Sequence, residues 1–287
     1  GALVSRQGGQ GPNDSDYYAG GSLIYNIVTI FDPNEKFRRD KANENDGGLL
    51  RHVYETSGLP RERGRIVAFE HNPQYTYAAA NLTQGYHSNK VREVTRQFLY
   101  LRGEREFFVV FDRAEATRAE LRRHFFLHVP TEPEIHGKLL SWLSLPEADG
   151  DKSVLSRGRS QMFLRTLLPR EAEIVKRGGP GQEAWGHPLE PTAQYNHLTE
   201  GRKRPPLCPW RIEVGDPDRG ARTLFLHVFE IGDEVARQPT DVTFVAPAGL
   251  DIAGRWRVRF HASGPLGGQV GDQNLTARIQ SEAQYAK

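Results

Sequence analysis

The sequence has 287 residues, of which 37% are hydrophobic and 26% are charged, and lysine plus arginine exceed aspartate plus glutamate by only two. This length suffices for one large core, while the near balance of charges excludes the strongly basic composition of a dedicated nucleic-acid-binding protein, so no nucleic-acid partner is expected. The single cysteine, Cys208, excludes an intramolecular disulfide and a cysteine-rich zinc module. No apolar stretch reaches the roughly 18 residues that a membrane-spanning helix needs, so no membrane span is expected.

Runs rich in valine, isoleucine, phenylalanine, tyrosine and threonine recur along the chain and predict β-strands. In chain order they are residues 22–32, 65–70, 93–101, 106–114, 123–129, 162–168, 210–214, 223–231, 241–247 and 255–262. Because no sustained helical spacing of apolar residues separates them, a parallel sheet with crossover helices is excluded. We expect an all-β fold, a large two-layer antiparallel β-sandwich, with helix limited to a turn or two near residues 116–121.

The segment QFLYLRGEREFFVVFD, residues 97–112, predicts a hairpin because a short polar turn separates two apolar runs. Residues 223–229 are apolar at successive positions, as in a strand covered on both faces. No internal repeat or break in composition marks a second domain, so residues 1–287 are expected to form a single large β-sandwich domain. Segments rich in glycine, proline, asparagine and charge are predicted loops: 7–16, 38–48, 148–158, 177–186, 200–209 and 263–273.

The segment GRWRVRFHA, residues 254–262, alternates strictly between apolar and basic side chains. In a strand, side chains on the same face are spaced by roughly 6.6 Å, so the basic residues form a ladder. The ladder consists of Arg255, Arg257, Arg259 and His261. Such a ladder suits the carboxylates or sulfates of a polyanion; the alternative is a solvated face whose arginines pair with acidic residues on adjacent strands.

Two further patterns bear on a metal site and on covalent catalysis. His124 and His128 share one face of a predicted strand, but a zinc site would need a third ligand, and no HExxH or paired CxxC motif supplies one. Histidines packed at the edge of the core are the alternative. Cys208 is flanked by prolines without a nearby histidine, and the nucleophile motif of serine hydrolases is absent. No metal ligand is therefore assigned from these patterns.

The segment NIVTIFDPNEKF, residues 26–37, followed by NDGGLLR, residues 45–51, resembles the heparinase II/III-type polysaccharide lyases. In that family a strand ends in Asp-Pro-x-Glu and an Asn-Asp-Gly-Gly turn follows it. The resemblance covers roughly residues 17–232, with further blocks in the order of the family. These blocks are YTYAAANLTQGYHSNKVREVTRQFLYLRGEREFFVVFDRAEA, HFFLHVPTEPEIHG, LRTLLPREAEIVKRGGPGQEAW, PWRIEV and LFLHVFEIGD.

This resemblance implies an N-terminal α/α toroid followed by an antiparallel β-sandwich, with the active site in the cleft between them. The present chain corresponds to the sandwich alone, so the helical toroid of the same protein is an expected partner and is absent from this chain. Where the family usually has His-Asn, this sequence has Tyr25-Asn26, and the family's aspartate ligand would fall near Ser5. The resemblance therefore implies that the family's metal site is lost and that no cofactor is needed, with zinc or calcium left open. It also implies a periplasmic or extracellular location.

These lyases cleave uronate-containing polysaccharides by β-elimination. The site must neutralise the substrate carboxylate, remove the adjacent proton and protonate the leaving oxygen. Tyr25 and Asn26 carry suitable groups and are the predicted catalytic residues. The predicted substrate-binding residues are Tyr17, Tyr18, Arg255, Arg257 and Arg259.

The expected ligand is thus an acidic polysaccharide or oligosaccharide, and this chain without its toroid is expected to be inactive. The local alternative is that the tyrosines pack over the rim of the sandwich and Asn26 caps a turn. For the whole chain, the alternatives are a non-catalytic carbohydrate-binding or structural β-sandwich module and a sandwich used for protein contacts.

Overall fold

The computed structural model describes residues 25–35, 47–48, 64–144, 160–179, 208, 210–218, 220–232 and 238–276. Within these residues the fold consists of antiparallel strands in three sheets, and the one helical element is a 3₁₀ turn, η2, at Thr83–Gly85. The predicted all-β antiparallel sandwich is confirmed. Whether residues 1–287 form a single domain stays a prediction.

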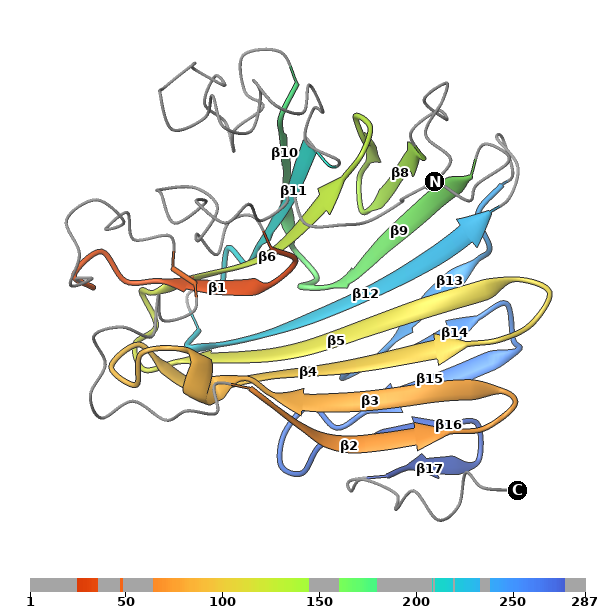
Figure 1. Cartoon of the computed structure of the whole chain (residues 1–287), viewed down its shortest axis with the longest axis horizontal. Coiled ribbons are helices and arrows are strands. Elements are labelled where there is room, and N and C mark those ends of the chain that lie inside the picture. Colours follow the sequence, from red (N-terminus) through yellow and green to blue (C-terminus); the bar gives the residue numbers. More distant parts are fainter. Residues whose placement is uncertain are drawn as a thin grey trace, which may run out of the picture.

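An eight-stranded sheet forms the centre of the structure (Figure 1). Tyr75–Asn81 alternates between buried and less buried positions, whereas Glu106–Ala116 and Arg222–Gly232 contain runs of consecutive buried residues. In spatial order the strands of this sheet are β2 (Arg65–His71), β3 (Tyr75–Asn81), β4 (Val91–Leu101), β5 (Glu106–Ala116), β12 (Arg222–Gly232), β9 (Gln161–Leu168), β8 (Leu139–Leu143) and β7 (Glu134–His136). The predicted hairpin at residues 97–112 is the β4–β5 pair, in which Leu101 faces Phe107.

A smaller sheet packs on each face of the large sheet. One has the order β1 (Val28–Phe31), β6 (Arg122–Val129), β11 (Trp210–Gly215) and β10 (Glu173–Arg177). The other has the order β13 (Val242–Val245), β14 (Gly249–Ile252), β15 (Trp256–Phe260), β16 (Gly268–Val270) and β17 (Gln273–Leu275). The predicted sandwich thus resolves into three sheets, because the large sheet buries apolar side chains on both of its faces.

Two hydrophobic clusters hold these layers together. Phe111 on β5 stacks on Phe260 on β15, with ring centroids 4.9 Å apart, in the cluster beneath the five-stranded sheet. Phe225 on β12 lies against Phe125 on β6 in the cluster beneath the four-stranded sheet. Strand β12 contributes to both clusters, which confirms that it is covered on both faces.

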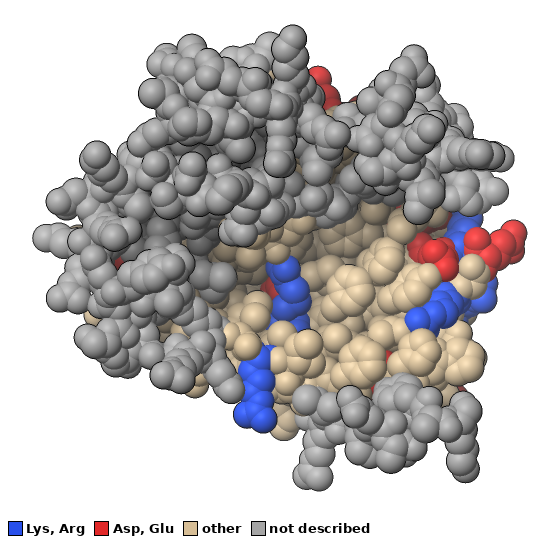
Figure 2. All heavy atoms as spheres, viewed as in Figure 1, with Lys and Arg blue, Asp and Glu red and all other residues tan. Residues whose placement is uncertain are grey.

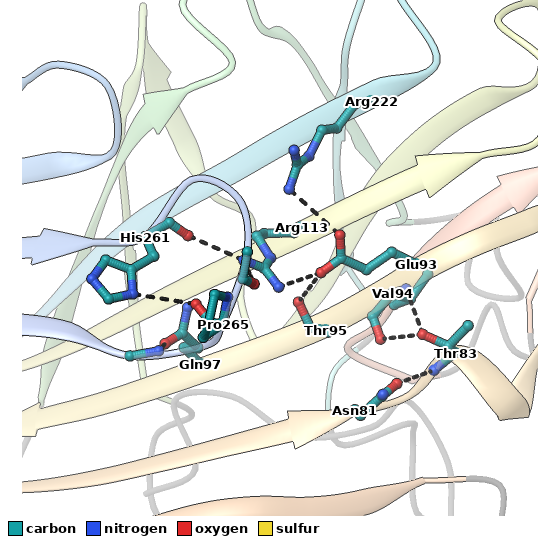
Figure 3. Close-up of polar contacts among 12 residues, drawn as sticks. Asn81, Thr83, Glu93, Val94, Thr95, Gln97, Arg113, Arg222, His261 and Pro265 are labelled. Atoms are coloured by element: carbon teal, nitrogen blue, oxygen red, sulfur yellow. Dashed lines mark hydrogen bonds and ion pairs between the residues drawn. The ribbon is translucent and has the colours of Figure 1, made fainter. Parts of the chain in front are cut away.

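A buried polar network fixes the five-stranded sheet to the large sheet (Figure 3). Arg113 on β5 forms an ion pair with Glu93 and donates to the backbone carbonyls of His261 (3.3 Å) and Gly264 (2.8 Å). Gln97 on β4 accepts from the backbone amide of Gly267 at 2.8 Å. Because Arg113 is only 4% exposed, its bonds to the β15–β16 loop lock that loop in one position.

The structure corrects four predicted elements. Residues 116–121 form no helix, because Ala116 ends β5 and the chain then turns, with the amide of Leu121 bonded to the carbonyl of Arg118. The predicted loop 263–273 contains strand β16 and the first residue of β17, and the predicted loop at 177–186 begins inside β10. Of the predicted strand 22–32, only residues 28–31 are a strand among the described residues. The predicted loops 7–16 and 148–158 lie outside the described residues.

Candidate functional site

Tyr25 and Asn26 lie directly before β1, the edge strand of the four-stranded sheet. Strand β1 pairs with β6, so residues that precede β1 lie beside the end of β6. Both residues are half-buried. Tyr17, Tyr18 and the position of Ser5 lie outside the described residues, so the Tyr25-Asn26 pair is the part of the predicted cleft that the structure describes.

Asn26 is held by two other strands, through His128 on β6 and Arg96 on β4. Its Oδ1 accepts a hydrogen bond from the backbone amide of His128 at 2.9 Å and lies 3.2 Å from Nδ1 of the His128 ring. Its backbone carbonyl accepts from Nη1 of Arg96 at 2.8 Å. Since Oδ1 faces a backbone donor, the amide orientation is fixed and its NH₂ group lies on the opposite side. The side chain is therefore rigidly positioned rather than free to rotate.

Arg96, which holds Asn26, is itself clamped by a bidentate ion pair. Its Nε and Nη2 donate to the two carboxylate oxygens of Asp112 at 2.7 and 2.9 Å. Asp112 is 1% exposed, and the guanidinium of Arg96 lies over the ring of Phe125 at 5.5 Å. Burial alone would lower the pKa of Arg96, but the pair with Asp112 raises it, so the guanidinium stays charged. We call Asn26, Arg96, Asp112 and His128 the Asn26 cluster.

His227 on β12 lies beneath this cluster and is completely buried. Its Nδ1 is 3.2 Å from Oγ1 of Thr166, and its ring centroid is 4.1 Å from that of Phe125. Burial, reinforced by the charge of Arg96, lowers the pKa of His227 to about 3. The imidazole is therefore neutral in the folded protein at neutral pH and supports the packing rather than carrying a charge.

This depressed pKa predicts a loss of stability in acid. Below pH 6.5 the unfolded chain binds a proton at His227 while the folded protein does not, so the free energy of unfolding falls as the pH decreases toward about 3. We expect this one residue to contribute up to about 1.4 kcal/mol per pH unit in that window. Urea titrations of the wild type and of His227→Gln at several pH values measure it: the variant should show a shallower pH dependence, and equal slopes would contradict the assignment.

The histidine pair on β6 does not form a metal site with other described residues. His128 is completely buried and His124 is partly buried, and burial lowers the pKa of His124. Among the described residues, no group of three or more histidine, cysteine, aspartate or glutamate side chains is placed to hold a metal ion. Whether the protein binds a metal stays a prediction. Cys208 is buried.

The arginine ladder is present, but far from the Asn26 cluster. The predicted alternation is confirmed, because Trp256, Val258 and Phe260 are buried while Arg255 and Arg257 are exposed. These arginines belong to the five-stranded sheet, whereas the Asn26 cluster lies on the opposite face of the large sheet. The structure therefore does not bring the predicted catalytic and arginine residues together.

The ladder arginines form no ion pair with an acidic side chain of the described residues. Arg259 donates to the backbone carbonyls of Val258 (2.8 Å) and Leu250 (3.2 Å). Arg257 faces Asp251 across the strand pair, yet among the described residues no ladder arginine comes within 4.0 Å of a carboxylate oxygen. The ladder thus presents positive charge that neighbouring acidic side chains do not neutralise.

A second row of side chains, not predicted from the sequence, lies on β4. Its alternate residues Arg96, Phe98 and Tyr100, with Arg102 directly after the strand, point to the side opposite the five-stranded sheet, because Leu99 and Leu101 belong to the cluster beneath that sheet. The alternation that revealed the arginine ladder is also visible in RQFLYLR, residues 96–102, and provided the signal. Figure 2 shows mostly uncharged side chains on this face of the large sheet, with Lys or Arg side chains among them and both basic and acidic side chains at the right-hand end.

Within the described residues, no helix is long and apolar enough to cross a membrane. No protein-family model matches the chain, and no curated protein matches it.

Two crystal structures of heparan sulfate lyase HepC from Pedobacter heparinus resemble the chain in three dimensions. A mutant of that enzyme matches with a TM-score of 0.48 and 10% identity, covering 90% of this chain and 31% of the lyase. The second structure matches with a TM-score of 0.49 and 10% identity, covering 98% of this chain and 35% of the lyase. The chain thus spans about a third of the length of these lyases. At this identity and with TM-scores below 0.5, the likeness assigns neither a family nor an activity to the chain.

Proposed function

We propose that this chain is the β-sandwich part of a polysaccharide lyase and that it binds acidic, uronate-containing polysaccharide. The observation that carries the proposal is the arginine ladder, in which Arg257 and Arg259 on β15 and Arg255 directly before it have no carboxylate partner among the described residues. An extended polyanion offers charges at repeated intervals, which such a row can meet. The ordered sequence blocks that resemble the heparinase II/III-type lyases support the assignment to β-elimination.

In this proposal Tyr25 and Asn26 are the contribution of the sandwich to the reaction. The NH₂ group of Asn26, oriented by the bond of its Oδ1 to His128, would hold the carboxylate of the substrate and stabilise the enolate-like charge. The phenol of Tyr25 would transfer the proton. The remaining groups would come from the helical toroid of the same protein, so we propose that the chain alone binds substrate without cleaving it, and that it acts in the periplasm or outside the cell.

A non-catalytic carbohydrate-binding module is the second candidate. It is favoured by the contacts of Asn26, whose Oδ1 and backbone carbonyl both accept hydrogen bonds from the framework. Those contacts give Asn26 a structural role that requires no part in a reaction. The two candidates share the binding of acidic polysaccharide and differ in whether Tyr25 and Asn26 act in a reaction once the toroid is present.

Heparin chromatography and a lyase assay test the proposal. The chain should be retained on heparin at low salt and eluted as salt screens the arginines, while a neutral dextran column should not retain it. Incubation with heparin, heparan sulfate, alginate or ulvan should produce no increase in the ultraviolet absorbance of unsaturated uronate. A steady increase would show that the sandwich is active alone and would contradict the need for a toroid.

Two triple variants distinguish binding at the arginine ladder from a general effect of positive charge. Replacing the three ladder arginines by alanine should move elution to clearly lower salt, because each lost contact reduces the number of counterions released on binding. The control replaces three exposed arginines on other strands, Arg65, Arg92 and Arg122, and removes the same charge. Equal shifts in the two triple variants would contradict the ladder as the binding surface.

A further inference from the structure

The part of the large sheet over which no described strand of the four-stranded sheet lies forms a second surface, which we call the β4 face (Figure 1). It consists of Phe98, Tyr100 and Arg102 on or directly after β4, Phe108 on β5, and Thr76 on β3. In Figure 1 no described strand of the four-stranded sheet lies in front of the right-hand ends of β3, β4 and β5, while the five-stranded sheet lies behind them. All five residues are half-buried, so part of each side chain reaches solvent.

The aromatic rings of this face form one continuous apolar row. Tyr100 and Phe108, which face each other across the strand pair, have ring centroids 4.8 Å apart and planes at 16°. Phe98 adjoins Phe108 at 5.4 Å with planes at 35°. These distances are those of offset-stacked and tilted aromatic pairs, so the rings support one another and keep their positions when a ligand arrives.

A fixed positive charge closes one end of the row. The guanidinium of Arg102 lies 4.7 Å from the centre of the Tyr100 ring, and its Nη1 donates to the backbone carbonyl of Asn72 at 3.0 Å. Its Nη2 donates to the hydroxyl of Thr76. Among the described residues, no carboxylate oxygen comes within 4.0 Å of Arg102. The charge is therefore positioned by neutral groups and is not neutralised by an acidic neighbour.

A hydrogen-bonding rim accompanies the apolar row. The Tyr100 hydroxyl donates to the carboxylate of Glu106, which is half-buried at the start of β5. That bond, together with burial, raises the pKa of Tyr100, so the phenol is protonated at neutral pH. Aromatic surface, a bonded hydroxyl–carboxylate pair and a lone guanidinium thus lie within one stretch of β4 and β5. This is the mixture of a mainly apolar surface and a few placed polar groups that small-ligand sites use.

We infer that the β4 face binds a stretch of acidic sugar chain, with the C–H faces of its rings against the Phe98–Phe108–Tyr100 row and a carboxylate or sulfate on Arg102. This inference rests on the proposed function and names a second surface for the same class of ligand. Phe98 to Arg102 spans two two-residue steps of a strand, roughly 13 Å, which accommodates a short run of linked sugar units. An apolar protein partner would bury Arg102 and Glu106 without providing opposite charges, and this burial would have a large desolvation cost.

Titration calorimetry with a short uronate oligosaccharide tests the inference. Arg102→Gln should lower the affinity about tenfold, because it removes a charged hydrogen bond from a half-exposed position that does not support the core. Phe108→Ala should also lower the affinity, because it shortens the apolar row. Val175→Ala is the matched control, since Val175 is a 44% exposed apolar residue on the distant edge strand β10. Urea unfolding of each variant shows whether it is folded. If Phe108→Ala does not fold, Arg102→Gln alone still tests the inference.

The outcomes separate this inference from the proposed function. If the wild type binds no acidic sugar, the proposed function fails. If the wild type binds, the ladder variant loses binding and Arg102→Gln binds as the wild type does, the proposed function stands and the β4 face is not a sugar site. Unchanged sugar affinity together with reduced self-association of Phe108→Ala would identify the face as a protein contact and overturn the inference. Loss of affinity in Arg102→Gln, with Val175→Ala unchanged, supports it.

Discussion

Replacing Asp112 by alanine should lower the free energy of unfolding by about 3 to 5 kcal/mol, the range measured when one partner of a buried ion pair is removed. The cause is Arg96, which would lose both of its carboxylate bonds while its guanidinium remains over the Phe125 ring. Arg96 also holds the backbone carbonyl of Asn26 at 2.8 Å. The substitution should therefore release the segment before β1 as well as destabilise the fold. Urea unfolding measures the first effect, and amide hydrogen exchange in residues 26–31 measures the second.

Two comparisons make this prediction specific. Glu120→Ala removes an ion pair at the surface, in which the side chain of Arg118 is 41% exposed and that of Glu120 is 69% exposed. It should change the free energy of unfolding by less than about 1 kcal/mol. Asp112→Asn keeps one acceptor and the shape of the side chain, so it should fall between Asp112→Ala and the wild type. A loss of less than about 1 kcal/mol in Asp112→Ala would show that the Asn26 cluster does not support the fold.

Gly268→Ala is expected to be nearly as damaging, for a steric reason. Gly268 has φ of 151°, and a Cβ atom there would lie 1.9 Å from the backbone carbonyl oxygen of Arg259 on the neighbouring strand. Neither backbone can move without breaking the β15–β16 pairing, in which Gly268 faces Phe260. We expect a loss of roughly 3 kcal/mol or more, at or beyond the upper end of overpacking effects. Soluble yield and urea unfolding measure it.

The neighbouring Gly271 provides the control for this substitution. It also has positive φ, at 58°, but nothing lies within 4 Å of a Cβ atom built there. Gly271→Ala should therefore cost only the conformational strain of a left-handed residue, about 1 to 2 kcal/mol. If the two alanine variants are equally stable, the close approach of β16 to β15 is not a constraint on the fold.

The sequence predicted those strands whose side chains pack in a regular pattern. β4, β5, β6, β9 and β12 carry long runs of branched and aromatic residues, and their predicted limits agree with the structure to within two residues. Strand β3 was missed because its sequence, YTYAAAN, contains three alanines, which have little strand preference on their own. Its place between β2 and β4 is set by tertiary pairing.

Strands β7, β8, β10, β14, β16 and β17 were also missed, and glycine explains the case of β16. Strand β16 begins at Gly268 inside a segment that also contains Pro265 and two further glycines, so local composition indicated a loop. The glycine is required there because only its small backbone fits against Arg259, and that contact between distant residues is not encoded in the local pattern. The absent helix at 116–121 is a related case, since a short charged segment becomes a turn when both flanking strands are fixed in the sheets.

Some features of the candidate site could likewise be predicted from the sequence, and others could not. The alternation of the ladder segment follows from strand geometry, and the structure shows Trp256, Val258 and Phe260 buried and Arg257 exposed. The guanidinium of Arg255 instead lies over the Trp256 ring. Sequence alone did not reveal that Asn26 is held by Arg96 and His128, which are 70 and 102 residues away along the chain. Nor did it reveal that the large sheet separates the ladder from Asn26, because the pairing of β5 with β12 and the stacking of sheets depend on long-range contacts.

We propose that the chain binds acidic polysaccharide through charge as well as shape. A calorimetric comparison of two oligosaccharides of equal length, one made of uronate units and one of the corresponding neutral sugars, at low and at high salt, tests this binding. We expect measurable binding of the uronate oligomer, weakening as salt increases, and much weaker binding of the neutral one. Equal affinity for both oligomers, or no binding of the uronate oligomer at low salt, would contradict it.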